Sequence, residues 1–216
     1  MSSLELPELM EKRLQIGVVG TRQRPFVEIL GLELRSKDGF EGLPQGKALD
    51  LTQAAPLEGF TGWIRGSMDY ASLTGSRLVI ITAGLARKPG MSREDLLAAN
   101  ARIVGPIAER VASHAPQAVL IVVTNPLDLM VALALKRSGF PRARVMGMAG
   151  VLDSARLRAF VAERLQVPPT AVQAMVLGSH GDLMVPLSSS LTVHGRPVTA
   201  SLPVEELESL FQRTRD

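Results

Sequence analysis

The sequence predicts an α/β protein built on a doubly wound parallel sheet. Two observations predict it. Short apolar runs alternate along the chain with longer amphipathic stretches, and each run is almost continuously apolar. Strands of that kind are typical of parallel sheets covered by helices on both faces. The predicted strands are Leu14–Val19, Leu78–Ala83, Ala118–Val123, Val145–Met148 and Val172–Leu177.

Helical patterns lie between and after these runs. In the longest, residues 91–116, apolar side chains recur every three or four residues, and Ser92 stands at an N-cap position before two acidic residues. The second pattern ends at Gly139, a common helix stop. The further helices are predicted over residues 125–141, 152–169 and 201–216.

The composition is that of an ordinary globular protein. The 216 residues carry 24 basic and 21 acidic side chains without a basic cluster, and only 4% of the residues are aromatic, so a nucleic-acid partner is not expected. The absence of cysteine excludes disulfides and thiolate metal ligands, and we expect no metal site. No signal peptide or membrane-length apolar stretch stands out, which predicts a cytoplasmic protein without a membrane partner.

One histidine has a context that suits chemistry. His180 follows an apolar run and has Gly178 and Gly181 on either side, so the backbone can turn and present the imidazole at the end of a strand. Ligands of open α/β sheets gather at the carboxyl ends of the strands. A glycine-flanked polar residue also marks a plain turn, so the pattern alone leaves both interpretations open.

Other candidate groups are equally ambiguous when each is taken alone. Asp153 and Arg156 share one face of the third predicted helix, where they form either a support for a histidine or a surface ion pair. Arg87 and Arg93 lie in a loop that suits anionic carboxylates or is merely solvated. Asn125 follows a strand, where it faces a ligand or caps the next helix.

The order of these motifs along the chain is more informative. From Gly42 onward the chain resembles the malate dehydrogenases of the lactate/malate dehydrogenase superfamily, and the 27-residue separation of Asp153 and His180 suits that family. The matching segments, in family order, are "GLPQGKALDL", "ITAGLARKPGMSREDL", "VVTNPLD", "GMAGVLDSARLR" and "VLGSHGDLMVPL".

The resemblance implies NAD-dependent interconversion of (S)-malate and oxaloacetate. His180 would exchange the proton of the substrate hydroxyl, and Asp153 would orient His180. Substrate would be bound by Arg87, Arg93, Asn125 and Arg156, of which Arg87 would pair with the second carboxylate that lactate lacks. The residues expected at the cofactor are Gly20, Asp38, Thr82, Gly84, Asn100 and Thr124.

The resemblance also implies an organisation. We expect a Rossmann-like NAD-binding domain over residues 1–145, followed over residues 146–216 by the N-terminal part of an α+β catalytic domain. Members of the family usually assemble from identical subunits, which implies a homodimer or homotetramer that acts on a small dicarboxylate.

Two stretches depart from the family pattern. The expected glycine-rich turn reads "GTRQRP" from Gly20, and only 18 residues lead from there to Asp38, which suggests a local frame disturbance. The last helix pattern carries apolar side chains that we expect to remain uncovered because the catalytic domain is incomplete: Leu202, Leu207, Leu210 and Phe211. The alternatives are therefore a catalytically impaired fragment or relic that retains the fold or its subunit contacts, or a lactate-type 2-hydroxy acid dehydrogenase.

Overall fold

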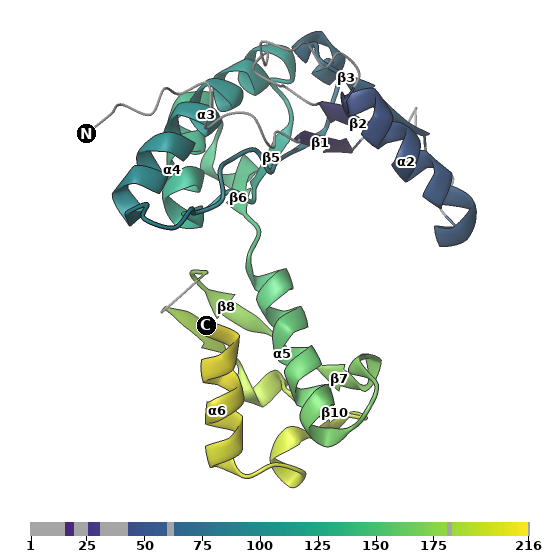
Figure 1. Ribbon diagram of the computed structural model, residues 1–216, viewed down its shortest axis with the longest axis vertical. Coiled ribbons are helices and arrows are strands. Elements are labelled where there is room, and N and C mark those ends of the chain that lie inside the picture. Colours follow the sequence, from purple (N-terminus) through teal and green to yellow (C-terminus); the bar gives the residue numbers. More distant parts are fainter. Residues whose placement is uncertain (1–15, 20–25, 31–42, 60–62, 181–182, 216) are drawn as a thin grey trace. The chain divides into compact units, whose positions relative to one another are not determined.

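The chain folds into two compact units, Met1–Gly147 and Met148–Asp216, which are described separately below (Figure 1). The computed structural model describes residues 16–19, 26–30, 43–59, 63–180 and 183–215. No helix in these ranges is long and apolar enough to cross a membrane.

The first unit is built on a six-stranded sheet in the order β3-β2-β1-β4-β5-β6. Strands β4, β5 and β6 are parallel to one another, as the sequence predicts, and β2 is parallel to β3. The side chains of β4 and β5 alternate between half-buried and buried. The strands are β1 (Ile16–Val19), β2 (Phe26–Leu30), β3 (Trp63–Ser67), β4 (Leu78–Ile81), β5 (Val119–Val122) and β6 (Val145–Gly147).

Strand β1 departs from the predicted parallel order, because it runs antiparallel to both of its neighbours, β2 and β4. The length of the connection explains this. A parallel crossover needs a dozen or more residues, whereas only residues 20–25 separate β1 from β2. Two strands joined so closely pair as a hairpin. Val19, the last residue of β1, consequently pairs with Leu78, the first residue of β4.

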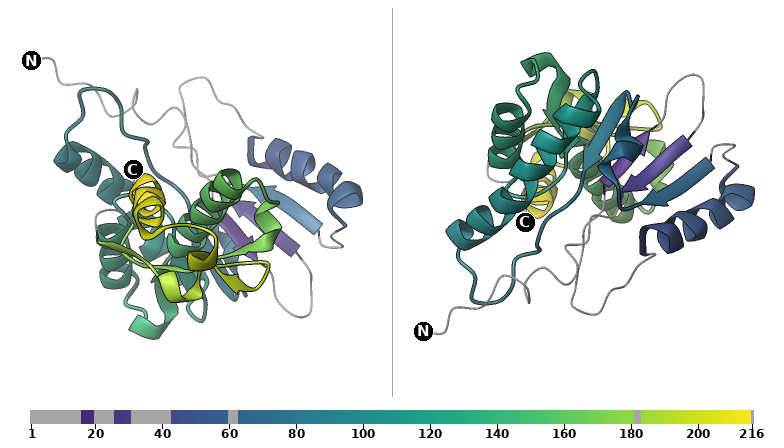
Figure 2. Two further views of the ribbon diagram at one scale, coloured as in Figure 1. Left: turned by 90° about the horizontal axis from the view of Figure 1, so that it is seen from below. Right: turned by 90° about the horizontal axis from the view of Figure 1, so that it is seen from above.

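Three elements near the start of the chain have no counterpart in the sequence prediction: β2, β3 and helix α2 (Leu43–Glu58). Helix α2 lies beside β2 and β3 (Figure 2). Its apolar residues do not form one continuous stripe, since Ala48 is buried while Leu49 and Leu57 are exposed. A search for apolar residues at helical spacing therefore does not detect this helix. The apolar-poor segment 32–38, where a second strand would fall in the family, lies outside the described residues.

The two long helices of this unit form where the sequence predicts them. Helix α3 (Arg93–His114) begins after Ser92, whose hydroxyl accepts a hydrogen bond from the Asp95 N–H, while Asp95 accepts one from the Ser92 N–H. Helix α4 (Leu127–Ser138) ends at Gly139, which adopts the left-handed conformation with φ of 65°. The two helices pack against each other, and α4 also contacts β5 and β6.

The second unit consists of helices α5 (Gly150–Leu165) and α6 (Val204–Arg215) with two small antiparallel sheets. The predicted strand Val172–Leu177 is in fact two strands, because its halves have different partners: Gln173 pairs with Thr192, and Val176 pairs with Pro186. The strands are β7 (Val172–Gln173), β8 (Val176–Gly178), β9 (Met184–Pro186), β10 (Thr192–Val193) and β11 (Arg196–Pro197).

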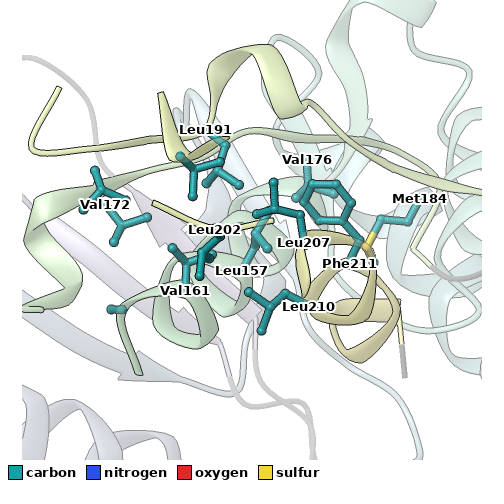
Figure 3. Packing of buried hydrophobic residues seen from close by; sticks show 13 residues of the cluster. Leu157, Val161, Val172, Val176, Met184, Leu191, Leu202, Leu207, Leu210 and Phe211 are labelled. Atoms are coloured by element: carbon teal, nitrogen blue, oxygen red, sulfur yellow. The ribbon is translucent and has the colours of Figure 1, made fainter. Parts of the chain in front are cut away.

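Helix α6 corrects a second expectation. Its apolar side chains are not left uncovered, because α6 packs against α5 and joins the core of the second unit (Figure 3). Relative exposures are 3% for Leu207, 8% for Leu210 and 6% for Phe211, and Leu202, which precedes the helix, is 4% exposed. These residues belong to the hydrophobic core of the second unit. Burial of each such side chain contributes about 1.5–3 kcal/mol to the free energy of folding.

Candidate active site

The second unit brings the predicted histidine and carboxylate together. His180 Nδ1 lies 3.0 Å from Asp153 Oδ2, across 27 residues of sequence. The Asp153 side chain is 2% exposed and that of His180 is 22% exposed. An ionised carboxylate only accepts hydrogen bonds, so Nδ1 of a neutral imidazole carries the proton and donates it. That tautomer leaves Nε2 as an acceptor, which is the state that a general base requires.

Arg156 completes this group. Its Nη1 lies 3.7 Å from Asp153 Oδ1, and its side chain is 43% exposed. Within the described residues, Oδ1 of Asp153 is buried and accepts no hydrogen bond, so Arg156 is the cation that faces it. Helix α5 supplies both residues, one turn apart, and its N-terminal dipole also favours the Asp153 carboxylate in the first turn.

The backbone leading to His180 is held in place by small residues. Gly178 has a φ of 88°, and a Cβ there would collide with the carbonyl oxygen of Leu183, so only glycine fits this turn. Ser154, which sequence reasoning missed, accepts a hydrogen bond of 2.9 Å from the Val176 N–H and so ties β8 to α5. Its position next to Asp153 in "LDSAR" was the available signal.

In the first unit, several predicted residues lie together at the carboxyl ends of the parallel strands β4 and β5. Thr82 and Asn125 are exposed there, and Gly84 is half-buried. Thr124 is buried, and its hydroxyl donates a 2.6 Å hydrogen bond to the Ala83 carbonyl. Helix α4 has Pro126 as its N-cap and no side-chain cap, so Asn125 is not a capping residue.

Asn100 lies beneath this edge and is fully buried. Its Oδ1 accepts from the Leu85 N–H at 2.7 Å, and its Nδ2 donates to the carbonyls of Leu85 and Asn125 at 3.3 and 2.6 Å. The predicted arginines are solvent-exposed by contrast. Arg87 donates from Nε to the Met91 carbonyl at 3.1 Å, and Arg93 is the first residue of α3.

Two predicted cofactor residues, Gly20 and Asp38, lie outside the described residues. Val19, the last residue of β1, lies beside Leu78, the first residue of β4. Thr82 and Asn125 lie at the other end of the strands, after the last residues of β4 and β5. In a parallel sheet β1 would also end there. No cluster of three or more metal-ligating side chains occurs in the described part of the chain.

Family models account for most of the chain. The model for the lactate/malate dehydrogenase NAD-binding domain matches residues 26–147, and the model for the lactate/malate dehydrogenase α/β C-terminal domain matches residues 150–216. The first match begins at β2, after the altered turn that follows Gly20.

Individual relatives agree with the family models. The malate dehydrogenase of Nostoc punctiforme is 56% identical over 83% of this chain and 55% of its own length, and that of Trichormus variabilis is 47% identical over 100% and 68%. The apo structure of malate dehydrogenase from Picrophilus torridus has 42% identity and a TM-score of 0.74, covering 81% of this chain and 56% of that one. The chain thus spans 55% and 68% of the lengths of these two curated relatives. With both units matched, the chain belongs to the lactate/malate dehydrogenase family.

Proposed function

We propose that this chain catalyses the NAD-dependent interconversion of (S)-malate and oxaloacetate, with His180 as the acid–base residue. The observation that carries the proposal is the 3.0 Å contact between His180 Nδ1 and the buried carboxylate of Asp153. A histidine held in one tautomer by a carboxylate is suited to proton exchange with a substrate hydroxyl at neutral pH.

The proposed proton path uses this pair. During malate oxidation, His180 Nε2 accepts the proton of the hydroxyl group, and during oxaloacetate reduction it returns that proton to the carbonyl oxygen. The imidazolium formed in the first direction faces the Asp153 carboxylate, whose charge stabilises it. NAD, when bound, supplies the acceptor for the hydride of the substrate carbon.

We expect arginine guanidinium groups to bind the two carboxylates of the substrate. Arg156 remains 43% exposed despite its ion pair with Asp153, so its free N–H groups are available to grip the carboxylate next to the reacting carbon. Arg93 would polarise the carbonyl oxygen, and Arg87 would pair with the distal carboxylate. The 3.1 Å bond to Met91 engages only the Nε of Arg87 and leaves its terminal nitrogens out of that contact.

The first unit offers residues that fit NAD at one edge. Thr82, Gly84 and Asn125 stand at the carboxyl ends of β4 and β5, where open α/β sheets bind dinucleotides. Gly20 lies outside the described residues, and its contribution stays a prediction of the resemblance. The preference for NAD over NADP rests on the Asp38 carboxylate, which would disfavour a 2′-phosphate. A cytoplasmic homodimer or homotetramer stays a prediction of the resemblance.

Binding and turnover test the proposal together. NADH fluorescence should change saturably on titration with the 216-residue chain, and the chain should then oxidise NADH when oxaloacetate is added. His180→Asn should abolish turnover while leaving NADH binding intact. The matched control is His194→Asn, because His194 is exposed and has a φ of 49° that asparagine tolerates, and its backbone N–H donates to the Ala171 carbonyl. Absence of NADH binding would favour the relic instead.

Substrate preference separates malate from lactate chemistry. Arg87→Gln removes the charge proposed to pair with the distal carboxylate, so the ratio of oxaloacetate to pyruvate kcat/KM should fall by about 10²-fold or more, as expected where a site loses a charged partner. Lys88→Gln, at the exposed neighbouring position, is the control. An unchanged ratio in Arg87→Gln would remove Arg87 from the specificity site.

A further inference from the structure

The buried amide of Asn100 has no free hydrogen-bond donor. A primary amide carries two N–H donors, and Nδ2 of Asn100 gives them to the carbonyl oxygens of Leu85 and Asn125. Its Oδ1 also accepts the Leu85 N–H, so the side chain pairs with both polar groups of one backbone residue. Asn100 is 0% exposed, and nothing of its amide reaches the surface.

These bonds join two segments that are far apart in sequence. Leu85 follows β4, Asn125 follows β5, and Asn100 belongs to α3, so one side chain connects three elements. A second buried connection lies beside it, where the Thr124 hydroxyl donates to the Ala83 carbonyl. We refer to Asn100, Thr124 and Gly84 as the strand-end clamp.

Gly84 shows how closely the clamp is packed. A Cβ at this position would collide with Thr124 Cγ2 and lie 3.2 Å from Asn100 Oδ1. The two buried polar side chains therefore lie close against the backbone of residue 84 and leave no room for a side chain there. The segment continues to Arg87, and the other strand end continues to the exposed Asn125.

We infer that Asn100 is a positioning residue, which sets the place of Asn125 and of the segment leading to Arg87, and that it does not itself contact the cofactor. The inference rests on the proposed function, since Asn125 and Arg87 are substrate residues only within it. It replaces the direct cofactor contact that the family resemblance implied for Asn100. The structural reason is that both donors of the amide are already bound to backbone carbonyls.

The first test uses the ligand-free chain. Asn100→Asp keeps the shape and an acceptor for the Leu85 N–H, but it places an oxygen against two carbonyl oxygens. We expect faster amide exchange in residues 83–86 and 123–125 of this variant, with the exchange of the Val176 N–H in the second unit unchanged. Thr124→Val, which removes the bond to Ala83, should have a similar effect and serves if Asn100→Asp does not fold. Unchanged exchange in both variants would overturn the inference.

The second test separates positioning from direct binding. Asn100→Asp should lower kcat/KM for oxaloacetate, by up to about 10²-fold if the substrate groups are displaced by an ångström. Thr124→Val loosens the same strand ends and leaves the Asn100 amide in place, so it should change the Kd for NADH by a factor similar to that of Asn100→Asp. When Asn125 is already replaced by alanine, Asn100→Asp should lower kcat/KM much less, because the Asn125 side chain through which Asn100 acts has been removed. Ser113→Ala, an exposed position of α3, is the control.

The outcomes are distinguishable. If Asn100→Asp weakens NADH binding by the same large factor with and without Asn125, Asn100 is a direct ligand and the inference is wrong. If the unmodified chain binds no NADH, the proposed function fails, whereas the exchange of residues 83–86 and 123–125 still decides whether Asn100 holds the strand ends.

Discussion

Gly84 is the residue at which the strand-end clamp makes a measurable prediction for stability. A methyl group at this position collides with Cγ2 of Thr124, a buried residue whose hydroxyl is hydrogen-bonded to the Ala83 carbonyl. Gly84→Ala should therefore lower the free energy of unfolding by about 1–3 kcal/mol, the usual cost of overpacking. Gly46→Ala is the matched control. Gly46 is exposed within α2, and a Cβ built there meets no other atom. Gly46→Ala should therefore raise the free energy of unfolding by about 0.5–1 kcal/mol. Urea unfolding of both variants checks the contrast, and equal midpoints would refute the close packing.

Single residues also show what the sequence does and does not predict about the site. Asp153 and His180 lie together as expected because helix α5 and the glycine turn at Gly178 each follow from local sequence. The contacts of Asn100 and Ser154 were not predicted. Both are small polar residues that bond to backbone groups of distant segments, and such partners depend on tertiary packing rather than on any local pattern.

At the scale of elements, the capping box of α3 links stability to pH. Hydrogen bonds from the Ser92 backbone N–H and from its side chain lower the pKa of Asp95. The folded state thus holds the proton of Asp95 less tightly than the unfolded chain does. The stabilisation is present above the ordinary pKa of aspartate and is lost as the pH falls through the folded value. Asp95→Asn should flatten this acid dependence of the urea midpoint, and an unaltered profile would contradict the capping role.

Helix α6 gives the second prediction at this scale. Phe211 is 6% exposed within the core of the second unit, so Phe211→Ala should cost about 3–5 kcal/mol of its stability. Val204, in the first turn of the same helix, is 63% exposed, and Val204→Ala should be almost neutral. Thermal unfolding followed by circular dichroism compares the two. Equal melting temperatures would mean that α6 does not pack as described.

Elements with a clear local pattern form near their predicted positions, whereas strand direction and strand division in two places depend on partners that the local pattern does not reveal. Helices α3 and α4 carry their own caps and apolar stripes, and each forms near its expected position. The antiparallel β1, by contrast, depends on the short connection to β2, and the division of Val172–Leu177 depends on strands that come later in the chain. Helix α2 was not predicted, because Leu49, Leu51 and Leu57 are exposed while Ala48 is buried, so its apolar residues do not form a single stripe.

At the scale of the whole molecule, two lines of argument lead to one family. The resemblance of five motifs predicted it, and family models match the two units over residues 26–147 and 150–216. The unexpected feature is β1, which runs antiparallel to both β2 and β4. The proposed NAD site lies at the carboxyl ends of β4 and β5, where Thr82, Gly84 and Asn125 stand.

The most direct measurement is oxaloacetate-dependent NADH oxidation by the 216-residue chain, compared with His180→Asn. The proposed mechanism predicts turnover in the range of ordinary enzymes, about 1–10³ s⁻¹, that His180→Asn abolishes and His194→Asn preserves. Turnover that survives in His180→Asn, or none in the unmodified chain, would contradict it.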